Sequence, residues 1–137
     1  PEWDTIRQSR IGILFQDLKI FPELTALENI ELKNRLQAYK SEAEIDDMLR
    51  RLEISDKSRQ PCGKLSWGQQ QRVAIIRALC QPFDFLLLDE PISHIDDRMA
   101  RIVAELIAEE VASRQAAVVV SSIGKELPLT YDNILNL

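Results

Sequence analysis

Residues 64–79, KLSWGQQQRVAIIRAL, and residues 85–91, FLLLDEP, decide how the rest of the chain is interpreted. The first stretch has the form of a loop that enters a helix, and the second is a short apolar run that ends in two acids and a proline. Because proline cannot donate to a strand ladder, Pro91 ends the second run. The two stretches therefore predict a loop, a helix and a buried strand that ends in a pair of carboxylates.

The start of the predicted helix offers a place for an anion. Ser66 precedes a run in which Val73, Ile76 and Leu79 recur at three-residue steps, so its hydroxyl is placed to cap the first turn. Unpaired amides and the positive end of the helix dipole attract phosphate there, and Gly68 lets a ligand approach the backbone. An ordinary capped helix explains the same residues, so this stretch alone leaves both readings open.

The apolar run Phe85–Leu88 predicts a strand covered on both faces, with its carboxyl end open to a site. In phosphoryl-transfer sites the first acid of such a pair can hold Mg²⁺ and the second can orient an attacking water. Asp89 and Glu90 are candidates for these two roles. A strand that simply ends in two solvated carboxylates is the alternative.

Composition indicates one folded domain and narrows its partners. The 137 residues are 45% hydrophobic, which is enough for a core. Lys and Arg number 17 against 22 Asp and Glu, a formal charge of −5 with both signs mixed, so no nucleic-acid partner is expected. Cys62 and Cys80 lack metal-ligand spacing and are expected to be reduced thiols of a cytosolic protein. No signal peptide is visible, and no apolar run approaches the roughly 20 residues of a membrane helix.

Other segments predict the remaining elements. Residues 11–15 predict a buried strand with Gln16 at its carboxyl end, where open α/β sheets bind ligands, whereas residues 1–10 predict no element. Two capping boxes, at residues 25–28 and 41–44, predict a pair of amphipathic helices that pack as a small unit. Later segments predict a helix from Asp96 or Asp97 to about residue 113 and another buried strand over residues 116–120.

Residues 55–63 are polar and contain Pro61, with Gly63 at their end. This composition predicts a linker between the helical pair and the helix expected within residues 64–79. A hinge in this linker would let the helical pair move relative to the sheet. That hypothesis fails if the linker is as well packed as the elements it joins.

Taken together, residues 64–79 and 85–91 resemble the signature and Walker B region of ATP-binding cassette (ABC) ATPases. The family's signature is usually Leu-Ser-Gly-Gly-Gln followed by Gln-Arg-Val and Ala-Arg-Ala-Leu; here Trp67 replaces the first glycine and Ile76 the alanine before Arg77. Residues 10–30 resemble the family's Q-loop and the start of its helical subdomain. The resemblance implies a P-loop NTPase-like α/β fold, in which helices flank a parallel sheet and a small helical subdomain is attached.

The resemblance implies roles on both sides of a nucleotide. Ser66, Gly68 and Gln69 would contact the γ-phosphate of ATP bound across a dimer interface. Residues 92–97, ISHIDD, resemble the D-loop, in which Asp96 is the matching acid and a further nucleotide-binding candidate. His94, the only histidine, falls at the variable position of that loop and is expected to be a loop residue rather than a general base.

The same resemblance implies a second group of residues on the chain's own nucleotide. Gln16 would sense Mg²⁺ and the reactive water, Asp89 would hold Mg²⁺ through water, and Glu90 would polarise the attacking water. A surface glutamine that merely follows a strand is the alternative for Gln16.

The chain also departs from the family's pattern. Ser121 and Ser122 stand where the family carries Thr-His, and a serine can neither become a cation nor span the same distance, which argues against hydrolysis by this half-site. No Gly-x-x-x-x-Gly-Lys-Ser/Thr loop occurs among the residues, so the chain as given has no ATP site of its own. We therefore expect the C-terminal two-thirds of a nucleotide-binding subunit, with residues 132–137 as its closing strand. The reading frame upstream of Pro1 distinguishes a shortened sequence from a remnant gene.

A missing phosphate-loop strand and helix would bare apolar surface beside residues 86–88, so we expect self-association or strand rearrangement to cover it.

Within the partial ABC domain, residues 1–19 would form the Q-loop strand region. Residues 20–80 would form the helical subdomain with the signature, and residues 81–137 the Walker B core with the C-terminal strands.

The resemblance implies a transporter subunit. Two such subunits, identical or different, would sandwich Mg²⁺ with ATP and would bind a transmembrane subunit at the cytoplasmic face of the membrane. A non-catalytic or remnant subunit that lends its signature face to a partner is one alternative, and a soluble ABC protein of DNA repair or translation is another. The short helical unit favours transport, and residues 24–30, LTALENI, resemble lipoprotein-release and related export ATPases. The sequence does not identify the transported substrate.

Overall fold

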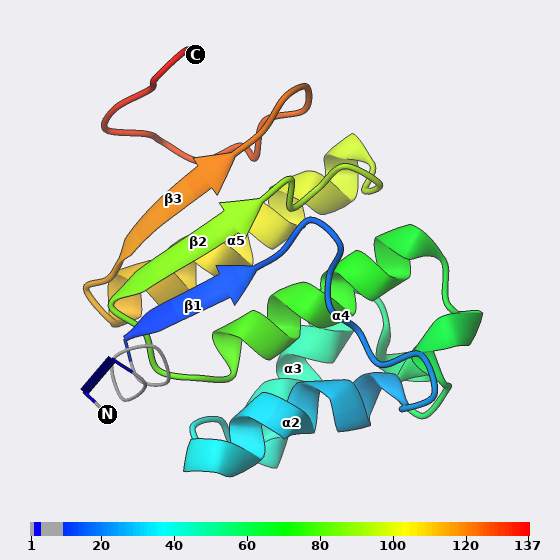
Figure 1. Ribbon diagram of the computed structural model, residues 1–137. Helices are drawn as coiled ribbons and strands as arrows, with labels where there is room; N and C mark the ends of the chain where they lie inside the picture. Colours follow the sequence, from blue (N-terminus) through cyan, green and yellow to red (C-terminus); the bar gives the residue numbers. More distant parts are fainter. Residues whose placement is uncertain (1, 4–9) are drawn as a thin grey trace.

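The structure is a computed structural model that describes residues 2–3 and 10–137. In this part of the chain, three parallel strands form a sheet in the order β1 (Ile11–Leu14), β2 (Phe85–Asp89) and β3 (Ala117–Ser121) (Figure 1). Leu14 pairs with Leu88, and Leu88 pairs with Val120, so the strands end at a common edge. The predicted parallel α/β sheet is confirmed. The prediction that residues 1–10 form no element lies mainly outside the described residues. Among residues 1–10 the structure describes Glu2, Trp3 and Arg10, and Glu2 and Trp3 are helical.

The helices are α2 (Ala26–Gln37), α3 (Glu42–Arg51), α4 (Trp67–Leu79) and α5 (Asp97–Ser113), with 3₁₀ turns at Ser55–Lys57 and Cys62–Lys64. Complete capping boxes open α2 from Thr25, α3 from Ser41 and α4 from Ser66, so the predicted caps are confirmed. Asp96 caps α5. No helix among the described residues is long and apolar enough to cross a membrane.

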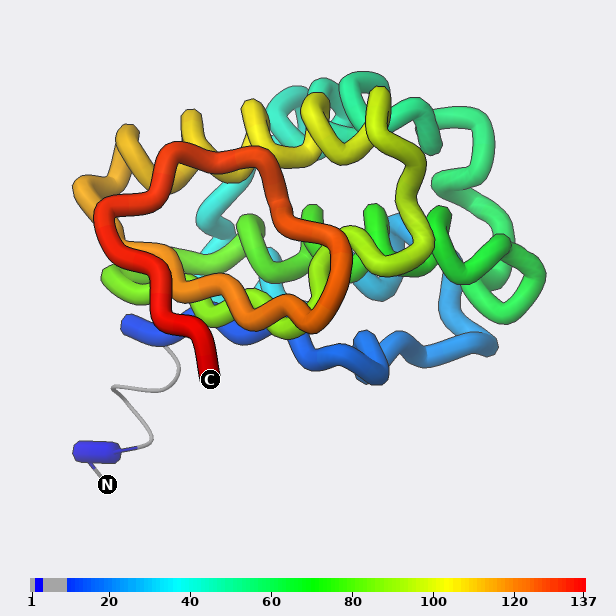
Figure 2. Tube along the Cα trace, turned by 90° about the horizontal axis from the view of Figure 1, so that it is seen from above, coloured from blue at the N-terminus to red at the C-terminus, as the bar shows by residue number. Residues whose placement is uncertain are grey.

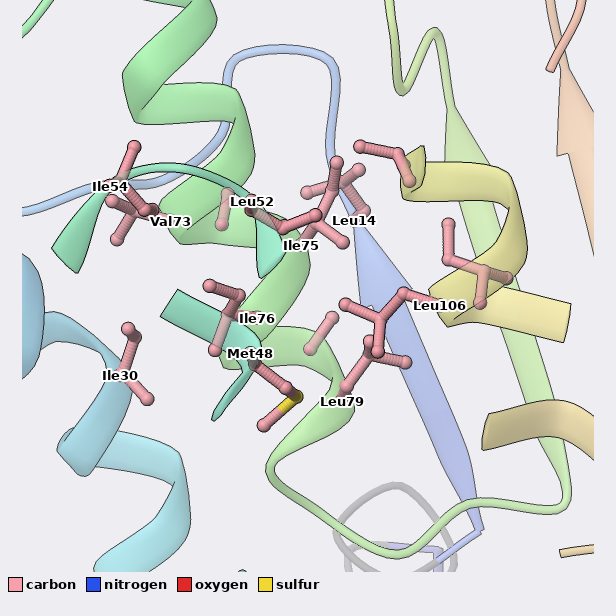
Figure 3. Packing of buried hydrophobic residues seen from close by; sticks show 14 of the residues in the cluster. Leu14, Ile30, Met48, Leu52, Ile54, Val73, Ile75, Ile76, Leu79 and Leu106 are labelled. Atoms are coloured by element: carbon pink, nitrogen blue, oxygen red, sulfur yellow. The ribbon is translucent and has the colours of Figure 1, made fainter. Parts of the chain in front are cut away.

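Helix α4 lies at the centre of the core. It contacts β1 and α5 on the side of the sheet and contacts α2 and α3 on the side of the helical pair (Figure 1). Its buried residues Val73, Ile75, Ile76 and Leu79 lie among side chains from each of these neighbours (Figure 3). A single continuous core therefore joins the sheet to the helical pair, as expected for elements that share one apolar layer.

The helices cover only one face of the sheet (Figure 2). Leu86 and Leu88 are buried against them, whereas the alternate residues Phe85 and Leu87 are 49% and 37% exposed. The prediction that β2 is covered on both faces is therefore wrong, and β3 is likewise only half-buried. A continuous apolar run does not show whether one face of a strand or both faces are covered. In either case the run supplies apolar residues to the face that packs against the helices. The expected bare apolar surface beside residues 86–88 is confirmed.

The hinge hypothesis for residues 55–63 is wrong. Cys62 is fully buried and its amide donates to Leu24 O at 2.9 Å, while Pro61 forms an antiparallel bridge with Thr25. Gly63 N also donates to Pro22 O at 2.9 Å. These bonds pair the linker backbone with the entry to α2, a pairing that its Pro and Gly content does not predict.

Ion pairs further attach the helical pair to α5. Lys40 lies 2.9 Å from Glu110 and Arg51 lies 2.6 Å from Glu109, with Lys40 and Glu110 both largely buried. Largely buried ion pairs restrain a packed interface more than fully solvated pairs do, because water screens them less.

The predicted closing strand over residues 132–137 is wrong, because residues 122–137 contain no strand. The segment is held by Leu127, which is fully buried, and by Tyr131 Oη, which donates to Leu127 O at 2.7 Å. Its last six residues are exposed and make no ladder. An apolar alternation alone does not form a strand when no neighbouring strand pairs with it.

Candidate functional site

The sheet brings one group of predicted residues to a common edge. Gln16 lies two residues beyond Leu14, and Glu90 lies two residues beyond Leu88, the register partner of Leu14. Asp89 pairs with Ser121 of β3. Gln16 and Asp89 are exposed, and Glu90 is half-buried. The carboxyl ends of these strands therefore gather an amide, two carboxylates and a hydroxyl at one open edge, the position where ligands bind in such sheets.

Glu90 is held in an unusual backbone conformation. Its φ is 50°, a left-handed value that few residues other than glycine adopt. The Glu90 amide donates to Ser121 O at 2.8 Å, and the Glu90 carboxylate accepts from the amide of Ile123. One carboxylate oxygen is thus engaged by the segment after β3, and a carboxylate can accept further hydrogen bonds through its second oxygen. Ser122, at the predicted switch position, is exposed beside this contact.

The turn after Gln16 is also strained. Leu18 and Lys19 have φ values of 62° and 52°, and Leu18 is buried. The Arg77 guanidinium, at the end of α4, donates to the carbonyl oxygens of both residues. Burial lowers the pKa of this guanidinium, but an arginine stays charged at any physiological pH. Arg77 therefore fixes the turn next to the candidate Mg²⁺-sensing glutamine.

A second group of predicted residues lies at the start of α4, in residues 65–69, which we call the signature turn. Ser66 Oγ accepts from Gln69 N at 3.1 Å, and Gln69 Oε1 accepts from Ser66 N at 2.9 Å. The Ser66 hydroxyl hydrogen remains available to donate, and Ser66 itself is exposed. This turn can therefore offer a hydroxyl and first-turn amides to an anion without losing its cap.

A surface hollow of about 270 Å³ brings three predicted residues together, namely Ser66, Gly68 and Asp96. Arg72 and Arg98 also line it. The Asp96 carboxylate caps α5 by accepting from Met99 N at 2.8 Å, and this bond is the main cause that lowers the pKa of Asp96.

The carboxyl group of Asp96 is thus engaged within its own chain. A second hollow, of about 290 Å³, lies along α3 and α5 and contains none of the predicted site residues. The predicted residues therefore fall into two places, the sheet edge and the signature-turn hollow.

Gly68 is packed against its own chain. A Cβ at this position would lie 2.4 Å from His94 O, a separation that real contacts do not allow. The Trp67 ring contacts the His94 ring edge-on, with centroids 5.9 Å apart. The sequence predicted that Gly68 serves a ligand, but the structure gives a second reason for a glycine there. His94 itself is an exposed loop residue, and its Nδ1 lies 3.0 Å from Ser93 Oγ.

The residues at the sheet edge fit a magnesium ion held mainly by phosphate and water. Asp89 and Gln16 present exposed oxygen atoms, the ligand type that Mg²⁺ prefers. Among the described residues, no group of three or more His, Cys, Asp or Glu side chains forms a protein-only metal cage. Mg²⁺ usually binds through one or two carboxylates plus substrate phosphates, so such a cage is not needed.

The sequence analysis did not single out three sets of contacts near the candidate site, which are made by Gln71, Arg77 and the Ile123 amide. Gln71 shares a helical face with Ile75 and Ala78, both buried, and is itself fully buried. A polar residue on an apolar face is the signal that could have identified it. The Ile123 contact is a backbone bond, which leaves no trace in the side-chain pattern.

The sequence of the chain is similar to those of known ABC transporter proteins. The sequence pattern of the family described as ABC transporter matches residues 2–93. The lipoprotein-releasing system ATP-binding protein LolD of Desulfotalea psychrophila is 33% identical over 142 aligned positions, which cover 99% of this chain and 62% of LolD. The arginine transport ATP-binding protein ArtM of Bacillus subtilis is 37% identical over 128 positions, which cover 88% of this chain and 52% of ArtM.

The fold of the chain is also similar to solved structures of an ABC transporter cassette. The dimeric structure of MJ0796, a bacterial ABC transporter cassette, superposes with a TM-score of 0.74 at 32% identity, covering 88% of this chain and 55% of MJ0796. A post-hydrolysis state of MJ0796 with ADP and Pi gives the same values. The chain thus spans between about half and two-thirds of the length of these three proteins.

Proposed function

The chain belongs to the ABC transporter family, and from this membership we propose that it is part of an ATP-binding, ATP-hydrolysing transporter subunit. The observation that carries the proposal is that the candidate residues lie at two separate places on one chain. The sheet edge offers Asp89 and Glu90, and the signature turn offers Ser66 on an exposed, capped helix start. Half-sites of this kind suit a dimer in which each nucleotide meets the sheet edge of one subunit and the signature turn of the other.

Each residue has a physical task in this proposal. Ser66 and the first-turn amides of α4 donate hydrogen bonds to the terminal phosphate, and Gly68 and Gln69 keep that turn in shape. Glu90 accepts a hydrogen bond from the attacking water and so orients it. Asp89 and Gln16 would hold Mg²⁺, and the ion would neutralise charge on the phosphates. Asp96 shapes the signature-turn hollow as the cap of α5.

The wider assignments follow from the same premise. The partners are a second ABC subunit, identical or different, and a transmembrane subunit, which would place the protein at the cytoplasmic face of a membrane. The division at residues 19 and 80 separates the first strand, the helical subdomain with the signature, and the Walker B core. LolD takes part in lipoprotein release and ArtM in arginine transport. In this proposal the transmembrane subunit determines which substrate is transported.

A non-catalytic subunit is the second candidate. It is favoured by the Glu90 carboxylate, which already accepts from the Ile123 amide, and by Ser122 at the switch position. In that case the signature turn would serve the partner's ATP while the sheet edge of this chain would not hydrolyse its own.

ATP hydrolysis by the product of the whole reading frame tests the proposal. Glu90→Gln is expected to lower kcat by about 10²-fold or more, whereas Glu126→Gln, an exposed control, leaves it unchanged. Ser66→Asp keeps a good helix cap but sets a negative charge against phosphate, so it should abolish hydrolysis while Ser66→Asn retains most of it. Hydrolysis that survives both Glu90→Gln and Ser66→Asp would refute the proposal. A product that binds ATP but does not hydrolyse it would favour the non-catalytic subunit.

A further inference from the structure

The strongest unassigned feature is Gln71, a fully buried side chain on α4 whose bonds all leave its own helix. They reach residues 90–95, which we call the acid turn because it begins at Glu90. Gln71 Nε2 donates to Glu90 O at 3.3 Å and to Ser93 Oγ at 2.8 Å, and Gln71 Oε1 accepts from His94 N at 2.9 Å. Both donors and the acceptor of one amide are thus used on a single loop.

We propose that Gln71 is a positioning residue that fixes the acid turn to the signature helix α4, so that Glu90 and the signature turn move as one body. The proposal rests on the proposed function only for the claim that Glu90 acts on water. The attachment itself is a property of the folded chain and needs no nucleotide.

The conformation of Glu90 explains why such an attachment is required. A left-handed residue other than glycine persists only where the surrounding structure determines it strongly. On one side the Glu90 amide is held by Ser121, and on the other the Glu90 carbonyl is held by Gln71. Removal of the Gln71 bond frees one of the two backbone restraints, so the Ser121 bond and the Ile123 amide alone would hold the left-handed residue and its carboxylate.

The close approach of the two backbones supports the same conclusion. No side chain fits between Gly68 and His94 O, because a Cβ would lie 2.4 Å from that oxygen. The neighbouring Trp67 and His94 rings also contact each other edge-on, with centroids 5.9 Å apart. Backbone contact beside a buried three-bond amide makes the acid turn and the first turns of α4 a rigid unit, since packed interiors resist even small shifts.

This arrangement has a consequence for a dimeric site. The signature turn faces one nucleotide, whereas Glu90 faces the other, so a rigid unit would transmit a displacement at one nucleotide to the glutamate at the other. The chain's own contribution to this coupling is one buried glutamine and one glycine without space for a side chain.

Amide hydrogen exchange in the 137-residue chain tests the attachment directly. Gln71→Met keeps the size of the side chain but removes its bonds, and exchange of the His94 amide should become about tenfold faster, the size expected for one lost hydrogen bond. Gln70→Met is the matched control, because Gln70 Nε2 bonds only to Leu65 O, next to its own helix. Amides in the middle of α5 report global stability and should be unchanged.

If Gln71→Met reduces global protection, Ser93→Ala removes one bond at an exposed position and should raise His94 exchange with the core intact. Equal His94 exchange in Gln71→Met and Gln70→Met would overturn the proposal.

Hydrolysis by the product of the whole reading frame tests the positioning role. Gln71→Met should lower kcat at least about tenfold with KM unchanged, because the glutamate is misplaced while phosphate contacts remain. An unchanged kcat despite a freed His94 amide would overturn this role. If the unsubstituted protein does not hydrolyse ATP, the proposed function fails, and the exchange result still decides whether Gln71 holds the acid turn.

Discussion

Gly68→Ala gives the sharpest test of the packing between the signature turn and the acid turn. The new Cβ would lie 2.4 Å from His94 O, and a normal carbon–oxygen contact is about 3.3 Å, so the two backbones must separate by about 0.9 Å. Such overpacking costs about 1–3 kcal/mol, whereas alanine in place of a helical glycine contributes up to about 1 kcal/mol of stability. We therefore expect a net loss of about 1 kcal/mol in the free energy of unfolding.

Urea unfolding of the 137-residue chain measures this loss as a lower midpoint at an unchanged m value. Gly124→Ala is the matched control, because a Cβ there meets nothing within 4 Å and the backbone is not left-handed. The control should be neutral or slightly stabilising. A Gly68→Ala chain that is more stable than the unsubstituted chain would refute the reasoning, since helix propensity would then outweigh a contact that the structure makes unavoidable.

Three further predictions concern the rest of the fold. Leu87→Lys should reduce concentration-dependent self-association in light scattering without lowering the urea midpoint, because this side chain lies on the bare sheet face; equal scattering would contradict that role. Arg77→Met should destabilise the chain by about 2 kcal/mol and speed exchange of the Leu18 amide, since it removes charged bonds to two left-handed residues; unchanged exchange would contradict it. Burial raises the pKa of Cys80 to about 12, so the folded thiol stays protonated where the unfolded thiol ionises. Because the unfolded state then binds fewer protons than the folded state, stability should fall by roughly 1–2 kcal/mol between pH 8 and pH 10, and urea unfolding of Cys80→Ala should lack that part of the loss.

Most of the fold was predictable from local signals. Capping boxes at Thr25, Ser41 and Ser66 fixed the starts of three helices, because such boxes satisfy backbone donors that every helix start must satisfy. The apolar run before Asp89 likewise predicted β2. These signals lie within a few residues, so the sequence carries them completely.

Features that depend on distant partners were not predictable. The one-sided cover of the sheet depends on which elements reach its second face, and the apolar pattern of Leu87 and its neighbours suits either case. The packed linker depends on bonds from Cys62 and Gly63 to a loop some 40 residues earlier in the sequence. The missing closing strand depends on the absence of a partner for residues 132–137.

The candidate site divides in the same way. The strand ends placed Gln16 and Glu90 at one edge, as parallel strands require. The left-handed backbone of Glu90 and the bonds from Gln71 arise only when α4 packs beside the acid turn. The sequence therefore indicated the candidate site residues, and the structure added the residues that hold them in place.

Mixing of two inactive variants tests the central claim, that the signature turn and the acid pair of one chain serve different nucleotides. Ser66→Asp and Glu90→Gln should each be inactive alone in the product of the whole reading frame. In an equal mixture that exchanges subunits, half of the dimers contain one intact composite site, so hydrolysis should return to about a quarter of the unsubstituted rate. A mixture that stays as inactive as its components would show that both residues serve the same nucleotide, and it would contradict the account.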